Sequence, residues 1–361
     1  MEKYSGILLL LLPILMSFVA VSLNAGYANA AVFLPPEDKP LVRHYYKKLN
    51  TCANVEPFVQ HQVKLYWDKD KTITAKLLKL LYADCMVNGC DASVLLTGPN
   101  TERNSSKNAR LDGYLLIDKI KKVLEIRCPR AVSCADILNL AVRDAAGAPS
   151  YPVFLGRRDG VESKAEWIDY PSPSMSWEEG LAYFESKNLD VQDFVTLLDY
   201  TGYVVIVLNA SHLVPISGAH TMGQAHCSSF YDRLYDFKGT GKPDPSMKRS
   251  VLVKLRDQCP KNSKNDSPVY FTEEYGSNYT FSNKFYTKVL AHESLLRVDQ
   301  QLSYGGDTGE LVNEYAKSLE QFRRGFALSI SRMGGLKVLT GKNGEIRQDC
   351  KFTNKNNPNI N

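Results

Sequence analysis

The chain has 361 residues, enough for one large domain or two ordinary ones. Apolar residues make up 44% of it, so a substantial core can form and an intrinsically disordered protein is excluded. The net charge of +5 is spread along the chain, which argues against a nucleic-acid-binding or membrane-surface protein and suits only weak attraction to an anionic matrix.

The N-terminus has the features of a secretory signal peptide. Lys3 gives a basic start, residues 7–23 are strongly apolar, and residues 28–30 read Ala-Asn-Ala, an A-x-A cleavage pattern. We therefore expect residues 1–30 to be removed before Ala31. A retained membrane anchor is the alternative, but the apolar run is short for a span and no second long one follows.

Eight cysteines in a secreted chain indicate a disulfide framework, although spacing alone cannot select among the possible pairings. The same compartment glycosylates asparagine in Asn-x-Ser/Thr sequons. Four such sequons begin at Asn104, Asn209, Asn265 and Asn278.

Helical periodicity dominates the chain beyond a proline-rich lead-in, and strand patterns are nearly absent. Helices are expected over residues 41–67 with a break near 50–52, 114–127, from about 132, 176–198 as two short helices, the first part of 231–259, and 311–333. These patterns predict an all-α single domain. The polar tail, residues 351–361, is expected to be disordered.

Residues 76–93 are the most informative stretch. An apolar run is broken by Lys79, which predicts a mostly buried helix with one polar side chain aimed at a specific partner. The following sequence, DCMVNGCDAS at 84–93, has two cysteines with a glycine between them, which suits a short disulfide-closed loop.

The oxygen atoms of this loop fit a calcium ion. Asp84, Asp91 and Ser93 carry hard side-chain oxygens, and the loop can turn the carbonyls of Val87 and Gly89 inward. Calcium takes about six to eight such oxygens. The alternative is a polar surface turn without a metal.

Residues 76–93 closely resemble the distal helix and calcium loop of the secreted plant haem peroxidases (class III). Members of that family read approximately LLRLHFHDCFVxGCDAS over this stretch. The calcium ligands match position by position. The catalytic residues do not, because the family's distal arginine falls on Lys79, its distal aromatic residue on Tyr82 and its distal histidine on Ala83.

This resemblance runs from about residue 41 to residue 350 and implies a haem peroxidase domain over residues 31–350. Its fold would comprise about a dozen helices, with haem b between a distal and a proximal half, two calcium ions and four disulfides. The implied disulfides are Cys52–Cys128, Cys85–Cys90, Cys134–Cys350 and Cys227–Cys259. The family reaction is the oxidation of phenolic donors by H₂O₂, in hydrogen peroxide catabolism and the response to oxidative stress.

Three further positions around the distal side follow from the resemblance. Glu102 falls on an acid that reaches the distal calcium through water. Asn108 falls on the asparagine that orients the distal histidine; with Ala83 no histidine remains, so Asn108 is expected to be only a loop residue. Residues 170–173, YPSP, are similar to the family's Leu-Pro-x-Pro, in which the first proline, here Pro171, has a carbonyl at the mouth of the donor channel.

Residues 199–216 interrupt the resemblance. In the family, the helix expected to end near residue 198 runs straight into the Ser-Gly-Ala-His motif that here begins at Ser217. Two explanations remain open, a real insertion that loops out of the proximal helix or a gene-model artefact. We favour the artefact, because an apolar insert beside an iron ligand is disruptive and nothing else in the chain is built to cover it.

His220, in the resumed motif, falls on the proximal haem-iron ligand. A zinc site with His226 and Cys227 is the alternative, but the chain lacks a second spaced Cys/His cluster, and a disulfide at Cys227 would remove that ligand. A ferric haem needs an imidazole whose other N–H is held by an acceptor. Asp299 falls where the family places that carboxylate.

The second calcium site is expected to be weaker than the first. Thr221 matches the family, Glu274 replaces an aspartate, Ser277 replaces a threonine, and Thr280 would supply a carbonyl. The last family aspartate is Ser282, which removes one formal charge, and calcium affinity depends on ligand charge.

The changed distal residues make catalysis the main question. Cleavage of H₂O₂ needs a base to carry a proton, worth about 10²–10⁴-fold, and a preorganised donor to offset charge, worth about 10²–10³-fold. Ala83 cannot carry a proton, Lys79 lacks the planar fork of arginine, and Tyr82 has an ordinary phenol pKa of about 10. Water in the vacated space would be an inefficient substitute, so we expect weak activity that Ala83→His with Lys79→Arg would restore.

Two other functions remain open, a fully active peroxidase rescued by another residue, and a non-catalytic, calcium-stabilised cell-wall or binding protein. We expect a monomer secreted to the apoplast or cell wall. Its expected partners are H₂O₂ and small phenolic donors, with no nucleic acid, and no membrane after signal cleavage.

Overall fold

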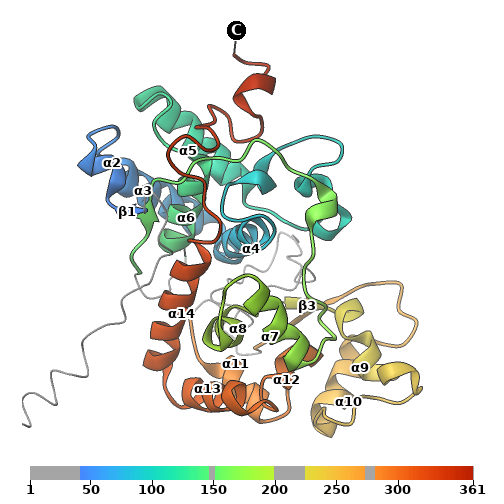
Figure 1. The fold of residues 1–361 in the computed structure, drawn as a ribbon. Helices are drawn as coiled ribbons and strands as arrows, with labels where there is room; N and C mark the ends of the chain where they lie inside the picture. Colours follow the sequence, from blue (N-terminus) through green and yellow to red (C-terminus); the bar gives the residue numbers. More distant parts are fainter. Residues whose placement is uncertain (1–40, 146–150, 199–223, 273–280, 361) are drawn as a thin grey trace, which may run out of the picture. The chain divides into compact units, whose positions relative to one another are not determined.

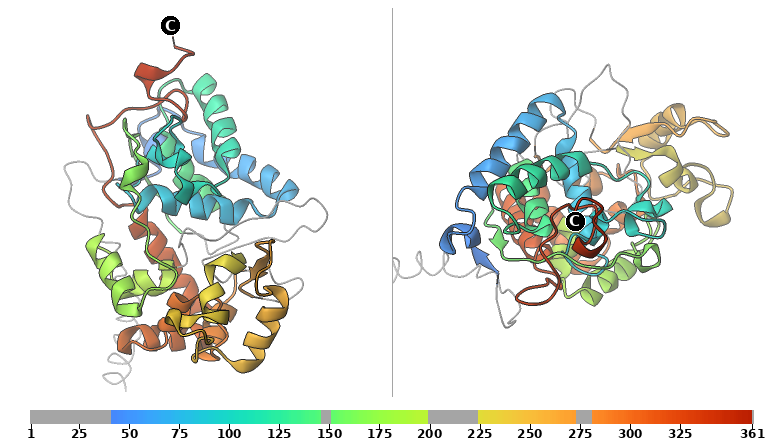
Figure 2. Two further views of the ribbon diagram at one scale, coloured as in Figure 1. Left: turned by 90° about the vertical axis from the view of Figure 1, so that its right-hand side faces the viewer. Right: turned by 90° about the horizontal axis from the view of Figure 1, so that it is seen from above.

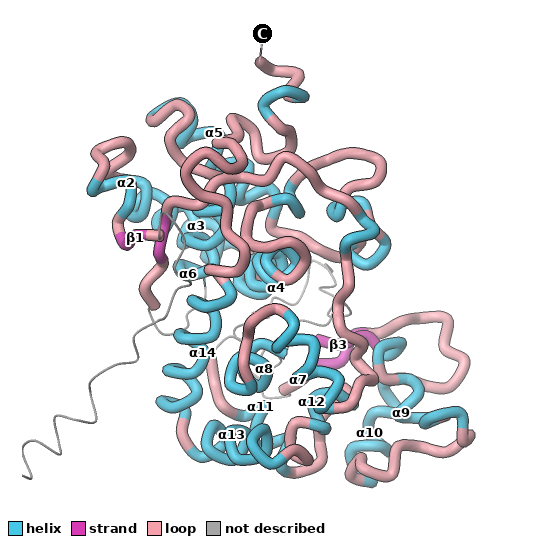
Figure 3. The backbone as a smooth tube through the Cα atoms, viewed as in Figure 1, coloured by secondary structure: helices cyan, strands magenta, loops and turns pink. Residues whose placement is uncertain are grey.

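The computed structural model describes residues 41–145, 151–198, 224–272 and 281–360, which belong to one compact unit. The predicted signal peptide, 1–30, and the predicted interruption, 199–216, lie outside these residues. Within the described residues there are thirteen α-helices and four short strands, so the all-α fold with about a dozen helices is confirmed (Figure 3).

The N-terminal part of this unit is a group of helices around α6. Its elements are β1 Val42–Arg43, α2 Tyr45–Lys48, α3 Val55–Lys69, α4 Ile73–Cys85, η1 Ser93–Leu95, η2 Glu102–Asn104, η3 Ser106–Asn108, α5 Tyr114–Arg127 and α6 Cys134–Ala145. Helix α6 contacts α3, α4 and α5. It starts where predicted, because the Ser133 hydroxyl accepts a hydrogen bond from the Asp136 N–H (3.1 Å).

The helices from α7 to α14 form a second group, drawn below the first in Figure 1. Its elements are α7 Trp177–Ser186, α8 Val191–Leu197, β3 Gln224–His226, η7 Cys227–Ser229, α9 Tyr231–Tyr235, η8 Phe237–Gly239, α10 Arg249–Gln258, β4 Pro268–Tyr270, α11 Lys284–Leu290, α12 Arg297–Gln301, α13 Gly306–Lys317 and α14 Leu319–Met333. Three later elements return to the first group or lie above it in Figure 1: β2 Phe154–Leu155, η4 Ala165–Trp167 and η9 Asn354–Asn356. Helix α8 packs on α7, α13 and α14, and α13 packs on α11.

The strands only join distant segments of the chain. β1 pairs antiparallel with β2, with Val42 opposite Leu155. β3 pairs antiparallel with β4, with Ala225 opposite Val269. Neither pair of strands forms a layer of the fold.

Two predictions about the C-terminal third were wrong. The helix predicted over 311–333 is two helices, because Ser318 is extended and its hydroxyl caps α14 by accepting from the Gln321 N–H (3.2 Å). The tail is ordered through residue 360 rather than disordered. Its polar groups are used internally, since the Thr97 N–H donates to the Lys351 carbonyl (2.9 Å) and the Asn354 N–H to Glu345 (2.9 Å) (Figure 2, red segment).

The four implied disulfides are confirmed, and no cysteine is left free. They are Cys52–Cys128, Cys85–Cys90, Cys134–Cys350 and Cys227–Cys259. Cys134–Cys350 joins residues 216 positions apart and ties the start of α6 to the C-terminal segment. Such cross-links limit the unfolded chain and stabilise the fold.

Candidate functional site

Helix α4 carries the residues predicted to face the haem on its distal side. Eleven of its thirteen residues are buried. The helix contacts α3, α6 and η1, so its position is fixed from several sides. Its N-terminal end is anchored by Lys76, whose ammonium lies 2.9 Å from both Asp70 and Asp112. The sequence therefore predicted the helix and its burial correctly.

Lys79 is a polar residue in the middle of this apolar helix. Removal from water lowers the pKa of Lys79 to about 8, and the positive charge of Arg110 adds to the shift. The side chain is therefore mostly protonated at pH 7 but loses its charge under mildly alkaline conditions. Lysine offers a point charge in place of the planar, bidentate guanidinium of arginine.

Ala83 and Tyr82 follow one turn later and are both fully enclosed, with exposed fractions of 2% and 1%. The ring of Tyr82 lies 6.0 Å from that of Tyr170, centroid to centroid. Ala83 has no group that can accept or donate a proton. Proton transfer near Ala83 therefore depends on other side chains.

Tyr170 supplies one such side chain. Its hydroxyl lies 3.1 Å from Asn108 Oδ1 and 3.3 Å from the Ala83 carbonyl oxygen, and donates its proton to these acceptors. The Asn108 amide nitrogen donates to the Glu102 carbonyl (3.0 Å). The expectation that Asn108 is only a loop residue is wrong, because it is buried and bonded on both sides of its amide.

A cavity of about 570 Å³ opens beside Tyr170. Pro171, predicted at the mouth of the donor channel, lines it together with Tyr170 and Pro173. Lys107 and Arg110 also line it and give it positive charge, although Arg110 lies 3.6 Å from the carboxylate of Asp266. Flat proline walls beside a tyrosine suit a small aromatic molecule.

The loop after α4 has the shape expected for cation binding. Asp84 accepts hydrogen bonds from the N–H groups of Ala92 (2.9 Å) and Val94 (3.4 Å), which fold the loop back on the helix end. Gly89 has φ +113°, and a Cβ there would lie 2.7 Å from the Leu336 carbonyl oxygen. The Cys85–Cys90 disulfide closes the loop, so its carbonyls are held in a tight turn.

Two buried carboxylates, Asp84 and Glu102, and the half-buried Asp91 lie near this loop. Burial and the charge of Asp91 raise the pKa of Asp84 well above its usual range. Burial raises the pKa of Glu102 to about 7, and burial raises the pKa of Asp91 as well. The charge of Arg347 opposes the shift at Asp91 and Glu102 but does not cancel it. Such a cluster is costly unless it is protonated or binds a cation.

Two oxygens of this cluster are available to a cation. Ser93 Oγ and Glu102 Oε2 are buried and make no hydrogen bond of normal geometry to described residues, although Ser93 lies close enough to lower the pKa of Glu102 somewhat. No three His, Cys, Asp or Glu side chains converge as a metal centre in the described ranges. A calcium ion would therefore also need main-chain carbonyls, as predicted for Val87 and Gly89, and the donor set fits that ion.

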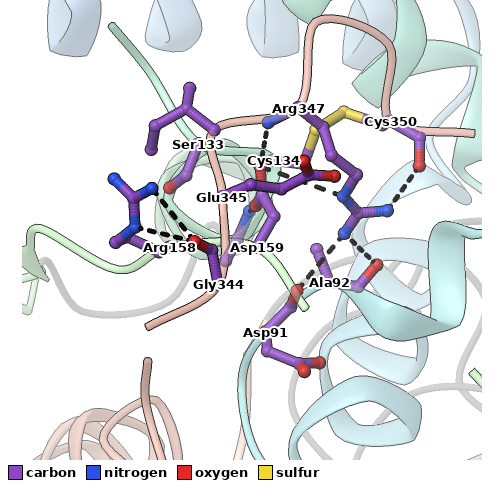
Figure 4. Close-up of polar contacts among 12 residues, drawn as sticks. Asp91, Ala92, Ser133, Cys134, Arg158, Asp159, Gly344, Glu345, Arg347 and Cys350 are labelled. Carbon is purple, nitrogen blue, oxygen red and sulfur yellow. Dashed lines mark hydrogen bonds and ion pairs between the residues drawn. A yellow bond between two sulfur atoms is a disulfide. The ribbon is translucent and has the colours of Figure 1, made fainter. Parts of the chain in front are cut away.

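Arg347 holds the loop in place through the loop's main-chain carbonyls (Figure 4). Its guanidinium donates to the carbonyls of Ala92 (2.6 Å), Asp91 (3.2 Å) and Cys350 (2.7 Å). Its main-chain N–H donates to Asp159 (2.9 Å), whose other oxygen accepts from the Ala135 N–H (2.9 Å). The arginine thus joins the loop, α6 and the C-terminal segment, and it positions the loop through main-chain carbonyls rather than through an ion pair with the loop carboxylates.

Comparison with known proteins decides the family. Residues 59–318 match the family model described as Peroxidase. The chain belongs to the peroxidase family. It is 51% identical over 350 residues to "Probable peroxidase 61" of Arabidopsis thaliana, covering 95% of this chain and 97% of that protein.

Other relatives place this peroxidase among the secretory plant enzymes. It is 49% identical over 340 residues to "Probable peroxidase 26" of Arabidopsis thaliana, covering 92% of this chain and 96% of the relative. It is 37% identical over 307 residues to "Peroxidase 57" of the same plant, covering 84% of this chain and 90% of the relative. These matches establish the haem peroxidase fold. By family membership the chain is a peroxidase, and the family's substrates are H₂O₂ and phenolic donors.

The proximal side of this peroxidase is only partly described. Asp299 lies on α12 and is buried, with 1% of its surface exposed. Its predicted partner His220 lies outside the described residues, as do the predicted ligands of the second calcium site, which are Thr221, Glu274, Ser277 and Thr280. These assignments therefore stay predictions.

Tyr170 is the residue that the sequence reasoning missed. It was aligned with the family's leucine, and only the proline after it was given a role. Two signals were present, an asparagine without its histidine at Asn108 and a hydroxyl where the family has an aliphatic side chain. Nothing in the sequence alone showed that the two residues, 62 positions apart, are in contact.

Proposed function

We propose that this peroxidase is a secreted protein that binds haem b and calcium and reacts slowly with H₂O₂. The main observation behind the proposal is that helix α4 has Lys79 and Ala83 at the positions of the family's arginine and histidine. The buried setting of Ala83 offers no described side chain that is a good proton acceptor near neutral pH.

The proximal residues that would hold the haem are His220, which would bind its iron, and Asp299, which would accept from the second ring nitrogen of His220. A carboxylate in that role makes the imidazole more electron-donating. Bound haem would supply an iron centre that peroxide oxidises and phenolic donors reduce. The burial of Asp299 supports this assignment, because a buried carboxylate needs a strong hydrogen-bond donor.

On the distal side the protein must move a proton from one oxygen of H₂O₂ to the other. Below its pKa of about 8, Lys79 is charged; it can offset negative charge but cannot accept a proton. Burial raises the pKa of the Tyr170 phenol well above its usual range, so this group stays protonated as well. Loss of a general base costs about 10²–10⁴-fold in rate.

The cavity beside Pro171 is the proposed site for phenolic donors. Its proline walls and its positive side chains favour a small aromatic molecule with an anionic or hydroxyl group. The loop at residues 84–93 is the proposed first calcium site, with Glu102 bonded through water. The second calcium site is proposed to be weaker, because Ser282 replaces a charged ligand.

Secretion to the apoplast or cell wall follows from the predicted signal peptide, the four disulfides and the sequons. None of the described helices combines the length and the apolarity that a bilayer span requires. We propose that the mature protein is a monomer and that it contributes to hydrogen peroxide catabolism under oxidative stress.

The test is spectroscopy and stopped-flow kinetics of the mature protein expressed with haem. A Soret band is expected, together with a rate constant for H₂O₂ at least about 100-fold below that of a family member with the arginine and histidine, measured in parallel. An equal rate would contradict the proposed weak activity.

A non-catalytic binding protein is the second candidate, favoured by the absence of a base beside Ala83 among the described side chains. It predicts no Soret band in the purified protein, while calcium binding at the first loop is kept. The same spectrum therefore separates the two functions.

A further inference from the structure

Two departures from the family pattern meet at one atom, Asn108 Oδ1. The family asparagine accepts a hydrogen bond from the distal histidine, which is Ala83 in this chain. Here the same oxygen accepts from the Tyr170 hydroxyl at 3.1 Å. Tyr170 itself stands where the family has leucine, so the chain has lost one donor to this oxygen and gained another.

The orientation of Asn108 makes this exchange specific. Its amide nitrogen donates to the Glu102 carbonyl (3.0 Å). This bond assigns the nitrogen and the oxygen of the side-chain amide, because only the nitrogen can donate. Oδ1 is therefore the end that faces Tyr170. Asn108 is only 3% exposed, so solvent is not a ready substitute partner for this oxygen.

The position of the Tyr170 hydroxyl is also fixed from the side of α4. It lies 3.3 Å from the carbonyl oxygen of Ala83, the residue at the histidine position, and its ring packs beside Tyr82. An imidazole introduced at residue 83 would have to approach Asn108 Oδ1 beside the Tyr170 hydroxyl, which lies against both that oxygen and residue 83. The phenol is half-buried between these groups and the cavity, and turning away would leave Asn108 Oδ1 without this donor.

We propose that Tyr170 is the positioning residue that has taken over the hydrogen bond of the missing histidine to Asn108, and that it holds the distal pocket in a form without a proton carrier. This inference rests on the proposed function. It changes the expectation from sequence, because Ala83→His with Lys79→Arg is then insufficient to restore rapid reaction with H₂O₂. Restoration also requires Tyr170→Leu.

The first experiment compares two restored proteins in stopped-flow mixing with H₂O₂. The double variant Lys79→Arg/Ala83→His is expected to gain less than about tenfold over the native rate, and addition of Tyr170→Leu is expected to give about 100-fold or more. The matched control adds Tyr151→Phe to the double variant, which changes another buried tyrosine and should leave the rate of the double variant unchanged. A double variant as fast as the one with Tyr170→Leu would overturn the inference.

The second experiment needs no catalysis. Tyr170→Phe removes only the hydroxyl and is expected to lower the folding equilibrium constant by about fivefold in otherwise native protein. In the Asn108→Ala background the same change should cost less than about twofold, because the acceptor is gone. Tyr151→Phe is the control, since the Tyr151 hydroxyl makes no hydrogen bond to described residues and should show no coupling to Asn108.

The two proposals fail in different ways. Absence of a Soret band from the native protein and from every variant would remove the proposed haem function, and the unfolding cycle would still decide the role of Tyr170. Equal effects of Tyr170→Phe in both backgrounds would remove the role of Tyr170, whatever the haem spectra show.

Discussion

Two adjacent parts of one short stretch have diverged differently from the family pattern. Residues 84–93 keep every side chain that the resemblance assigns to the first calcium ion, whereas Lys79 and Ala83 keep neither of the distal catalytic side chains. Both parts are largely buried, and both belong to, or directly follow, helix α4. The boundary between the kept and the changed residues falls between Ala83 and Asp84.

The difference separates the scaffold from the chemistry. The loop is bonded to α4 through Asp84, to the C-terminal segment through Arg347 and to itself through Cys85–Cys90. A change there would disturb three segments at once. Lys79 and Ala83 are the positions at which the family's reaction chemistry would act, and the fold persists with both of them changed.

Removal of calcium should have the largest effect on stability, and that effect should grow with pH. Without the ion, burial raises the pKa of Glu102 from its usual 4.5 to about 7, so the folded state binds a proton more tightly than the unfolded state. The free energy of unfolding should then fall as pH rises from about 4.5 to 7, by about 3 kcal/mol from this group. Asp84 and Asp91 are shifted in the same direction and add to the loss.

The measurement is calorimetric unfolding across that pH range, with excess calcium and with a chelator. Bound calcium keeps the carboxylates ionised, so the downward trend should be confined to the chelated protein. Identical pH profiles in the two conditions would mean that the loop at residues 84–93 does not bind calcium.

Asp84→Asn is expected to have the next largest effect, and the effect should depend on calcium. Loss of one ligand charge should weaken binding by about 100-fold, which corresponds to about 2.7 kcal/mol of stabilisation by the ion. In a chelator the variant should lie within about 1 kcal/mol of the native protein, because it also removes a buried carboxylate. Calcium titration calorimetry and unfolding measure the two parts.

Asp118→Asn is the matched control for this variant. Burial also raises the pKa of Asp118, but this carboxylate lies on α5 beside Lys351 rather than in the loop. Its replacement should leave calcium affinity unchanged. Equal losses in both variants would show that the effect is general destabilisation.

The helices could be predicted wherever an amphipathic pattern is bounded by a strong terminator. Residues 114–127 were predicted as one helix and form α5, which ends before Cys128 and Pro129. The break at Ser318 was missed because the apolar pattern continues across it from α13 into α14. The disulfide pairing came from the resemblance alone, since spacing leaves it open.

The disulfide-closed loop at residues 84–93 could be predicted because its residues are contiguous in sequence, and calcium binding there stays a prediction. Its shape is held by local hydrogen bonds, as from the Ser93 N–H to the Asp91 carboxylate (3.0 Å). The contact between Tyr170 and Asn108 could not be predicted, because it depends on how two loops pack against α4. Long-range contacts of this kind have no periodicity or spacing that a single sequence displays.

The smallest predicted effect concerns proton transfer by Lys79. Since the pKa of Lys79 is lowered to about 8, the fraction of neutral amine should rise about tenfold between pH 7 and pH 9. A neutral amine can accept a proton, so the slow reaction of native protein with H₂O₂ should accelerate by about tenfold over this range. Lys79→Met should abolish the rise, whereas Lys107→Met, at the cavity wall, should keep it. A rise that survives Lys79→Met would assign the proton transfer to water and leave helix α4 without any catalytic group.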